Sequence, residues 1–340
     1  MIGGRATRRV ADSSDVSWQL DGITMEGTVV RPDGNGPFPA VVLVAGSGPT
    51  DRDWCSPMVP GSQGSGRLIA EALAQAGIAS LRYDKRASGP HAIDSATKLL
   101  GKISMQSHLD ELVAAVQVLT GMDRIDSSRI VGLGHSEGTI HVLRYATSTQ
   151  LVPFAGLVLA APPGRPIGMV LQSQLAHQIA QIPDGIEFLP LIEEAAARYA
   201  SGEPMNPDPA LPDSIKMVLA GFEAPQNLPF ARELWVESAC GSLSRVQIPT
   251  LVLIGGQDVQ VDIQADGEPL QEAAAFKPNV TFAFPPNANH VLKKDTREPA
   301  EAAGAPLKGY NEAGVHLDPD SLECILTWLE ELFARAVPPA

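Results

Sequence analysis

One serine of this chain lies in a pattern that would make it a nucleophile. Ser136 is at the centre of Gly-His-Ser-Glu-Gly at residues 134–138, between a strand-like run and a helical pattern over residues 139–147. A sharp strand-to-helix turn would project the hydroxyl above the sheet edge, and its closely spaced backbone needs small residues at 134 and 138. The start of the helix would place the backbone N–H of Glu137 where an oxyanion can form. This arrangement predicts attack of Ser136 on a carbonyl carbon.

A serine needs a base and an orienting acid before it reacts at neutral pH. Where a catalytic serine lies on such a strand-to-helix turn, the order along the chain is serine, then acid, then histidine. Asp258 follows the strand-like run 250–254 and His290 follows the run 280–284, so both are expected on loops at the carboxyl ends of later strands. We therefore predict that Ser136, Asp258 and His290 are the catalytic residues. Asp262 is the alternative acid, and His316 is the alternative late histidine.

The loop after the first core strand has a glycine on each side of a serine. Gly46, Ser47 and Gly48 follow the apolar run 40–45, and the glycines would let the backbone turn and approach a substrate closely. The second oxyanion donor is expected from this loop. We predict that the N–H of Ser47 and the N–H of Glu137 form the oxyanion hole, with Gly46 and Gly48 supporting the loop. The N–H of Gly48 is the alternative donor.

Charged residues follow both this loop and the next strand. The Asp-Arg-Asp sequence at residues 51–53 is expected to form local ion pairs that brace the loop. Asp84 and Arg86, after the run 78–83, are expected to tie their own turn to the same loop through hydrogen bonds. An alternative function of Lys85 or Arg86 is to bind a carboxylate of the substrate.

The elements that must position these residues alternate between strand and helix. Apolar runs rich in Val, Ile and Leu are typical of strands buried on both faces of a parallel sheet. They lie at residues 40–45, 78–83, 129–133, 155–160, 250–254 and 280–284. Helical patterns cover residues 67–76, 105–119 and 322–333, and an antiparallel hairpin is expected from residues 16–25 and 27–31. This order predicts an α/β fold with a mostly parallel central sheet flanked by helices.

Strand-like runs are missing between residues 163 and 247, where the sequence is helical and interrupted by prolines. We predict that residues 1–162 and 248–340 form a core domain, and that residues 163–247 form a helical cap inserted before the penultimate strand. Ser136 precedes this insertion, whereas Asp258 and His290 follow it. Many apolar residues of the cap are expected to pack against the core domain, and some are expected to line an acyl pocket.

Length and composition exclude several classes of protein. The chain has 340 residues, of which 44% are hydrophobic and 19% charged, as in a globular protein. A net charge of −14 argues against nucleic-acid and anionic-membrane partners. The cysteines at 55, 240 and 324 form no CxxC pair, and no spacing resembles a metal site. We therefore expect no metal, no cofactor and a cytoplasmic location. No apolar run suits a signal peptide or a membrane span, and a homo-oligomer is compatible with the sequence.

These motifs together resemble the α/β-hydrolase superfamily over nearly the whole chain. The carriers of the resemblance are the segment 134–138, the turn 255–258 and the pair Asn289-His290. Residues 46–53 and 81–86 more narrowly resemble a bacterial esterase group, dienelactone-hydrolase-like or serine-aminopeptidase-like. The resemblance implies a Ser–His–Asp hydrolase with a helical cap that acts on short acyl esters. Residues 85–91 depart from that group's Asp-Arg-Gly-x-Gly-x-Ser pattern, so its substrate preference does not carry over.

The predicted function is hydrolysis of a small-molecule carboxylic ester through an acyl-enzyme. A thioesterase for CoA esters is disfavoured because the cap has few basic residues. An aminopeptidase would need an acidic anchor for the substrate amine, for which the cap offers Glu187, Glu193, Glu194 and Glu233. A non-catalytic binding protein with the same fold would usually lack one of the three catalytic residue types, and all three are present.

Overall fold

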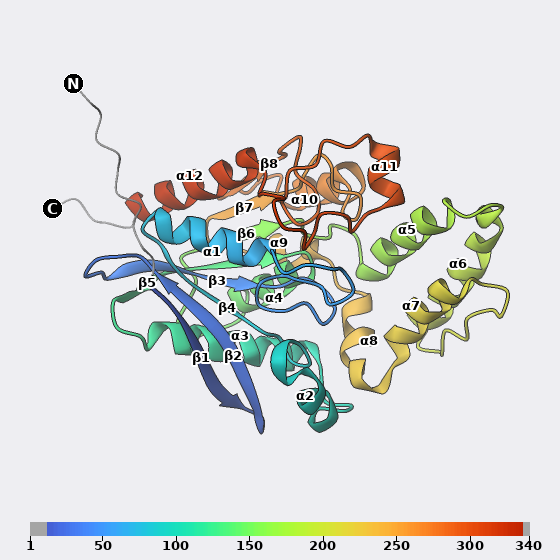
Figure 1. The fold of residues 1–340 in the computed structure, drawn as a ribbon, viewed down its shortest axis with the longest axis horizontal. Coiled ribbons are helices and arrows are strands. Elements are labelled where there is room, and N and C mark those ends of the chain that lie inside the picture. Colours follow the sequence, from blue (N-terminus) through green and yellow to red (C-terminus); the bar gives the residue numbers. More distant parts are fainter. Residues whose placement is uncertain (1–11, 336–340) are drawn as a thin grey trace.

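An eight-stranded sheet forms the centre of the computed structural model, which describes residues 12–335 (Figure 1). The strand order is β1-β2-β4-β3-β5-β6-β7-β8. The strands from β3 to β8 run parallel, whereas β2 pairs antiparallel with both β1 and β4. Their bounds are β1 (Asp12–Leu20), β2 (Ile23–Arg31), β3 (Phe38–Val44), β4 (Ala79–Tyr83), β5 (Ile125–His135), β6 (Gly156–Ala160), β7 (Thr250–Leu253) and β8 (Val280–Ala283). The predicted α/β fold with a mostly parallel sheet is confirmed.

Helices cover both faces of the sheet because its central strands are apolar on both sides. In β3, Val42 and Val44 belong to one buried cluster, and Val41 and Leu43 belong to another. Successive side chains of a strand point to opposite faces, so a continuous apolar run needs a helical layer on each face. The first face is covered by α3 (Met105–Thr120) and α4 (Glu137–Ala146), and the second by α1 (Ser65–Gln75) and α12 (Pro319–Arg335).

The hairpin at the start of the sheet turns earlier than predicted. β1 ends at Leu20 and β2 begins at Ile23, so the turn consists of Asp21 and Gly22. Both residues have positive φ, 50° and 78°, which is the geometry of a tight hairpin turn for which Asp-Gly is a strong signal. The prediction of a break near residue 26 is wrong, because it followed the apolar runs and not the turn residues.

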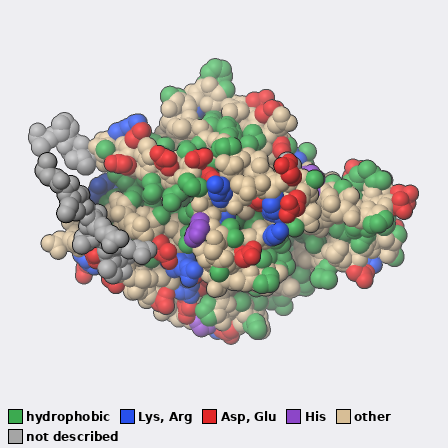
Figure 2. Space-filling model, turned by 45° about the horizontal axis from the view of Figure 1, so that its top comes forward, with side chains coloured by type: hydrophobic (Ala, Val, Ile, Leu, Met, Phe, Trp, Pro, Cys, Tyr) green, Lys and Arg blue, Asp and Glu red, His purple; other side chains and the backbone are tan. Residues whose placement is uncertain are grey.

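The chain between β6 and β7 forms helices that pack mainly on one another. These are α5 (Ile167–Ile179), α6 (Leu189–Ala200), α7 (Asp213–Glu223) and α8 (Phe230–Trp235). They lie beside the sheet at the right of Figure 1 and form the narrower part at the right of the surface in Figure 2. Leu175, Ile192 and Tyr199 belong to a separate apolar cluster there, so the expectation that many of the cap's apolar side chains pack against the core domain is wrong. In contrast, α9 (Ala239–Leu243) contributes to the main core.

Short helices without a predicted counterpart also occur. They are α2 (Ala92–Lys98), α10 (Glu268–Ala273) and α11 (Pro299–Gly304). α11 lies in a polar segment whose sequence has no clear periodicity, so its helical form was not foreseeable from apolar spacing. Among residues 12–335, no helix is both long enough and apolar enough to cross a membrane.

Candidate functional site

Ser136 lies in the sharp turn between β5 and α4. Its φ of 52° and ψ of −121° are rare for a residue with a side chain, and such strain persists only where the surroundings enforce it. Here the surrounding backbone is very close. A Cβ atom added at Gly134 would lie 2.6 Å from the nitrogen of Thr139, and one added at Gly138 would lie 2.7 Å from the oxygen of Ala45. The turn therefore requires glycine on both sides, and Ser136 alone among residues 131–140 is partly exposed.

Asp258 and His290 form a buried hydrogen-bonded pair. Nδ1 of His290 lies 2.9 Å from Oδ2 of Asp258. A carboxylate only accepts hydrogen bonds, so the Nδ1–H donates and Nε2 is left to accept a proton. The other oxygen of Asp258 accepts from the backbone N–H groups of Gln260 and Val261, at 2.8 and 2.9 Å. Both carboxylate oxygens are thus fixed, which fixes the orientation of the imidazole.

The loops that carry this pair lie in direct contact. A Cβ atom added at Gly256 would lie 2.7 Å from the oxygen of Pro286, and one added at Gly255 would lie 2.6 Å from the carbonyl carbon of Ala288. The N–H of Gln257 donates to the oxygen of Ala288 at 2.9 Å. The two glycines before Asp258 therefore allow the acid's loop to approach the histidine's loop.

The histidine's loop in turn contacts the turn that carries Ser136. The Nε2–H of His135 donates to the backbone oxygen of His290 at 2.8 Å, and the two imidazole centroids are 4.8 Å apart. The structure thus brings Ser136, Asp258 and His290 to the same end of the sheet. Within residues 12–335, no hydrogen bond joins the Ser136 hydroxyl to His290; this bond is often long in an enzyme without substrate.

His135 has a structural role in this arrangement. Its ring stacks on Trp54, with centroids 4.9 Å apart. Burial, together with the nearby charge of His290, lowers the pKa of His135 to about 3. The ring is therefore neutral at pH 7, which fits its single role as a donor to the loop of His290.

The predicted oxyanion loop lies against Ser136. A Cβ atom added at Gly46 would lie 3.2 Å from the Cβ of Ser136. Gly48 has a φ of 76°, a conformation that favours glycine. In the part of the chain that the structure describes, the backbone N–H groups of Ser47 and Glu137 donate no hydrogen bond. Both groups are free to donate to a substrate oxygen.

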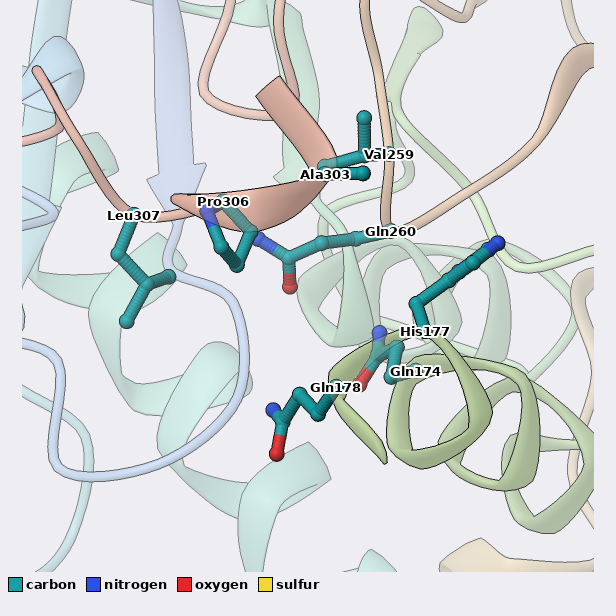
Figure 3. A pocket seen from close by; sticks show the side chains of 8 residues that line it. All are labelled: Gln174, His177, Gln178, Val259, Gln260, Ala303, Pro306 and Leu307. Atoms are coloured by element: carbon teal, nitrogen blue, oxygen red, sulfur yellow. The ribbon is translucent and has the colours of Figure 1, made fainter. Parts of the chain in front are cut away.

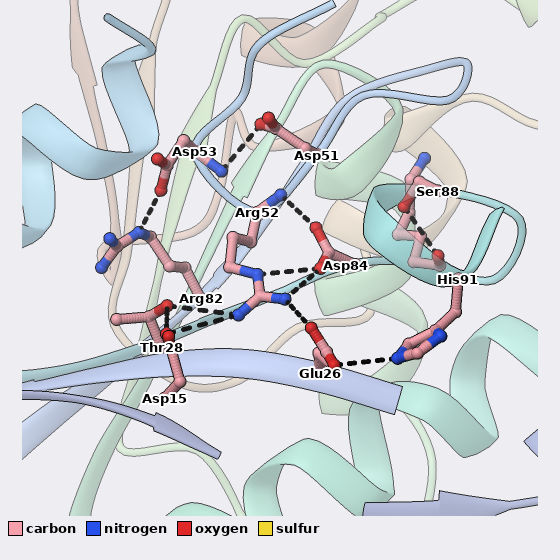
Figure 4. A network of polar contacts seen from close by, with 11 residues as sticks. Asp15, Glu26, Thr28, Asp51, Arg52, Asp53, Arg82, Asp84, Ser88 and His91 are labelled. Carbon is pink, nitrogen blue, oxygen red and sulfur yellow. Dashed lines mark hydrogen bonds and ion pairs between the residues drawn. The ribbon is translucent and has the colours of Figure 1, made fainter. Parts of the chain in front are cut away.

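Arg52 ties this loop to β2 and to the end of β4 (Figure 4). Its backbone N–H and its Nε donate to the two oxygens of Asp84 at 2.7 and 2.8 Å, and its Nη2 lies 2.6 Å from Glu26. Asp53 pairs with Arg82 at 2.6 Å. The hydrogen bond from Arg52 lowers the pKa of the Glu26 carboxyl against the opposing effect of burial. The predicted tie through Asp84 is confirmed. The predicted local ion pairs are not, because Arg52 and Asp53 pair with distant residues and Asp51 accepts from the backbone N–H groups of Asp53 and Cys55.

Lys85 and Arg86 are buried and paired, so neither is available to a substrate. Nζ of Lys85 lies 2.7 Å from Oε1 of Glu137, and Nε of Arg86 lies 2.5 Å from Oε1 of Glu111. The hypothesis that either residue binds a substrate carboxylate is wrong, because each side chain already pairs with a buried glutamate. These glutamates lie on helices distant in sequence, so the pairing could not be foreseen. Arg86 also pairs with Asp21 and not with the oxyanion loop, contrary to the expectation.

The alternative acid and base candidates have other positions. Asp262 accepts hydrogen bonds from the backbone N–H groups of Gln264 and Ala265 and so caps the helical turn that follows it. His316 is exposed. Among the described residues, no group of three or more His, Cys, Asp or Glu side chains is arranged to hold a metal ion.

A buried lysine near the pair was missed by the sequence analysis. Nζ of Lys293 donates to the backbone oxygens of Gln63, Gly309 and Tyr310, at 2.6, 3.3 and 2.8 Å. Burial lowers the pKa of Lys293 to about 8. The hydroxyl of Tyr310 lies 2.5 Å from Nε2 of Gln260, so the polar segment 297–314 is held against the loop of Asp258. Only the position of Lys293, three residues after His290, could have signalled this role.

A cavity of about 90 Å³ lies between α5, α11 and the loop after Asp258 (Figure 3). Amide and imidazole groups line it beside small apolar side chains. The lining residues are Gln174, His177, Gln178, Val259, Gln260, Ala303, Pro306 and Leu307. Val259 and Gln260 directly follow Asp258, so the cavity adjoins the loop of the acid, although Ser136 and His290 do not line it.

Comparison with known proteins finds similarity at two levels. The sequence model of the family described as "Alpha/beta hydrolase family" matches residues 41–295. A protein of Thermotoga maritima named Esterase EstD is 30% identical over 306 residues. The match covers 90% of this chain and 65% of the relative, so the chain spans less than two thirds of the relative's length.

Solved structures share the fold at low sequence identity. The proline iminopeptidase of Mycobacterium smegmatis is 16% identical with a TM-score of 0.56, over 95% of this chain and 100% of that chain. An esterase of Pyrococcus furiosus is 15% identical with a TM-score of 0.54, over 97% and 95% of the two chains. Est1E of Butyrivibrio proteoclasticus is 14% identical with a TM-score of 0.53, over 94% and 99%. The family match and the shared fold confirm the resemblance inferred from the sequence, and this chain belongs to the alpha/beta hydrolase family.

Proposed function

We propose that the protein is a serine hydrolase that cleaves carboxylic esters through an acyl-enzyme intermediate. Ser136 is the nucleophile, His290 is the general base, and Asp258 orients His290. The observation that carries the proposal is the 2.9 Å hydrogen bond between His290 Nδ1 and Asp258 Oδ2, on loops that meet the strained turn of Ser136.

The reaction has two halves that use the same groups. Nε2 of His290 takes the Ser136 proton as Oγ attacks the acyl carbon, and the backbone N–H groups of Ser47 and Glu137 donate to the oxyanion. Asp258 stabilises the imidazolium, which gives its proton to the leaving alcohol. A water molecule then attacks the acyl-enzyme by the same route, releasing the acid and restoring Ser136.

Esters are favoured over other acyl substrates by the relatives and by the cap residues. The relative from Thermotoga maritima is named an esterase. A CoA thioester needs free basic residues, but Arg165 pairs with Asp266 and Arg232 donates to backbone oxygens of Tyr199 and Glu203. An aminopeptidase remains the alternative on the same three residues, because a similar structure is a proline iminopeptidase. No carboxylate lines the cavity of Figure 3 to anchor an amine.

We further propose that residues 163–247 act as a cap, with α5 to α8 as its body. The cavity between α5 and α11 would receive one end of a small acyl ester, and its amide side chains suit an uncharged polar group. A cytoplasmic location stays a prediction, which is supported by three cysteines without a disulfide. A homo-oligomer also stays a prediction.

A panel of substrates tests the proposed chemistry. Wild-type protein is expected to hydrolyse p-nitrophenyl acetate and butyrate faster than a matched thioester or an aminoacyl p-nitroanilide. Ser136→Ala should abolish ester turnover without a change in circular dichroism. The matched control is Ser127→Ala, because Ser127 is an exposed serine near the opposite end of the same strand and should not affect turnover.

The partners of the nucleophile give a second test. His290→Gln removes the base, and Asp258→Asn leaves the histidine in the wrong tautomer, so each should lower kcat by several orders of magnitude, about 10⁴-fold for the acid. Full ester turnover by Ser136→Ala, or faster cleavage of the anilide than of the esters by wild-type protein, would contradict the assignment.

A further inference from the structure

One lysine contacts both halves of the proposed oxyanion hole. Nζ of Lys85 lies 2.6 Å from the backbone oxygen of Gly46 and 2.7 Å from Oε1 of Glu137. The Lys85 side chain is 5% exposed and that of Glu137 is 3% exposed. The lysine thus links the peptide before Ser47 to the side chain of the residue that follows Ser136.

The geometry of the peptide group gives this link a consequence. The carbonyl of Gly46 and the N–H of Ser47 belong to the same planar trans peptide, so they point in nearly opposite directions. A donor that holds the carbonyl on the side of Lys85 directs the N–H of Ser47 to the other side. Gly46 lies against Ser136, and within the described structure the N–H of Ser47 donates no hydrogen bond, so this N–H is left to donate to a substrate oxygen.

We infer that Lys85, held by the carboxylate of Glu137, is a positioning residue that fixes the Gly46–Ser47 peptide with its N–H directed into the oxyanion hole. The inference deepens the proposed function and rests on it. Glu137 then serves twice: its backbone N–H donates to the oxyanion, and its side chain orients the lysine that sets the second donor. One buried ion pair therefore sets the spacing of both donors.

The charge state of the pair supports this role. Burial alone would raise the pKa of the Glu137 carboxyl, but the charge of Lys85 and the hydrogen bond from His141 hold it below its ordinary range. The carboxylate is therefore ionised throughout the neutral range. An ammonium group donates a stronger hydrogen bond to a carbonyl than a neutral donor does, and the ionised carboxylate of Glu137 holds the Lys85 side chain in place.

A neutral double variant separates positioning from stability. Lys85→Met with Glu137→Gln removes both charges together, so the protein should stay folded, since buried pairs are often replaced by uncharged residues without loss. The bond to the Gly46 oxygen is nevertheless lost. We expect kcat for p-nitrophenyl butyrate to fall by about 100-fold, the effect of losing one oxyanion donor, with KM unchanged. The affinity for a trifluoromethyl ketone, whose adduct carries an oxyanion, should fall in parallel.

The matched control is Arg86→Met with Glu111→Gln. This pair is at least as buried, and Arg86 directly follows Lys85 in the sequence. It makes no contact with Gly46 in the described structure. It should leave kcat and the inhibitor affinity unchanged. If both double variants lose activity equally, the effect is a general one of buried charge and the inference fails.

The outcomes distinguish this inference from the proposed function. If wild-type protein lacks Ser136-dependent esterase activity, the proposed function fails. If wild-type protein is active and the Lys85/Glu137 double variant keeps the same kcat, the positioning role is overturned. Should the double variant not fold, the isosteric Glu137→Gln variant provides the test, since it weakens the hold on Lys85. A smaller fall in kcat at constant KM is then expected, and an unchanged kcat overturns the inference.

Discussion

The loop of residues 46–53 is held from two sides by two different kinds of ion pair. The inner brace is Lys85 with Glu137, whose side chains are 5% and 3% exposed. The outer brace is Arg52 with Asp84 and Glu26, in which the arginine is 14% and the glutamate 28% exposed. Asp84 and Lys85 are adjacent and directly follow β4. The segment after a single strand therefore supplies one residue to each brace.

The difference in burial indicates that the inner brace affects catalysis, whereas the outer brace only holds the loop in place. The outer brace borders an open groove, where water and salt weaken charge interactions. The inner brace is closed from water and contacts the peptide of Ser47 directly. Breaking the inner brace is expected to reduce both stability and catalysis, whereas breaking the outer brace is expected to reduce stability alone and by less.

The largest expected effect comes from breaking one half of the inner brace. Lys85→Met alone leaves the carboxylate of Glu137 buried without its cation, which typically destabilises a protein by about 3–5 kcal/mol. Urea unfolding at pH 7, followed by circular dichroism, measures the change. The Lys85/Glu137 double variant should recover most of the loss, and a single variant as stable as wild-type protein would show that the pair is not closed from water.

Breaking the outer brace should have a smaller effect that depends on salt. Arg52→Met removes the guanidinium but keeps the backbone N–H that donates to Asp84, so a loss of about 2 kcal/mol is expected, as for a hydrogen bond between charged groups. The difference from wild-type protein should shrink in 1 M NaCl, about the ionic strength at which charges only a few ångströms apart are screened. An equal loss of stability in low and high salt would show that the outer brace is as well closed from water as the inner brace.

The pH dependence of stability gives a third test of the inner network. Burial, partly offset by the hydrogen bond to Glu137, lowers the pKa of His141 to about 4, below its ordinary value of about 6.5. Between these values the unfolded chain binds a proton that the folded protein does not, so stability falls as pH falls from about 6.5 to about 4. The contribution of ionised Glu137 stays constant above about pH 4.5, because a carboxyl with a depressed pKa loses its contribution only below that pH.

His141→Gln removes the imidazole that binds this proton in the unfolded chain. Between about pH 6.5 and 4, the free energy of unfolding of the variant should therefore fall by about 1.4 kcal/mol less per pH unit than that of wild-type protein. Urea unfolding midpoints at pH 6 and pH 5 measure the difference. His135, whose pKa is about 3, contributes to the same slope and leaves a remainder in the variant. An identical slope in variant and wild-type protein would mean that His141 is not buried in its neutral form.

The smallest effect is expected at an exposed ion pair. Lys98 and Asp94 lie one turn apart on α2 with Nζ and Oδ2 2.8 Å apart, and both are at least half exposed. Lys98→Met should change the free energy of unfolding by no more than about 0.5 kcal/mol. A loss as large as that of Arg52→Met would remove the distinction between the outer brace and an ordinary surface pair.

The sequence predicts the central sheet and the positions of the site residues well for a physical reason. Strands buried on both faces appear as continuous apolar runs, and the residues that follow them must meet at one edge of a parallel sheet. Ser136, Asp258 and His290 each follow such a run. Their placement therefore depends only on local patterns and on the parallel order of the strands.

Features that depend on distant partners could not be predicted in this way. Lys85 and Arg86 resemble free cations in sequence, but their carboxylates are 52 and 25 residues away along the chain. Likewise, the contacts of Lys293 with Gln63 and Tyr310 join segments that no periodicity connects. The early hairpin turn is different, because Asp21-Gly22 is a local signal that apolar spacing concealed.

Covalent labelling shows directly whether Ser136 is an activated nucleophile. A fluorophosphonate forms a covalent adduct only with an activated serine, and peptide mass spectrometry identifies the labelled residue. A single adduct is expected on Ser136, absent in Ser136→Ala and formed much more slowly in His290→Gln. An adduct on another serine, or ester turnover by a protein whose Ser136 stays unlabelled, would contradict this expectation.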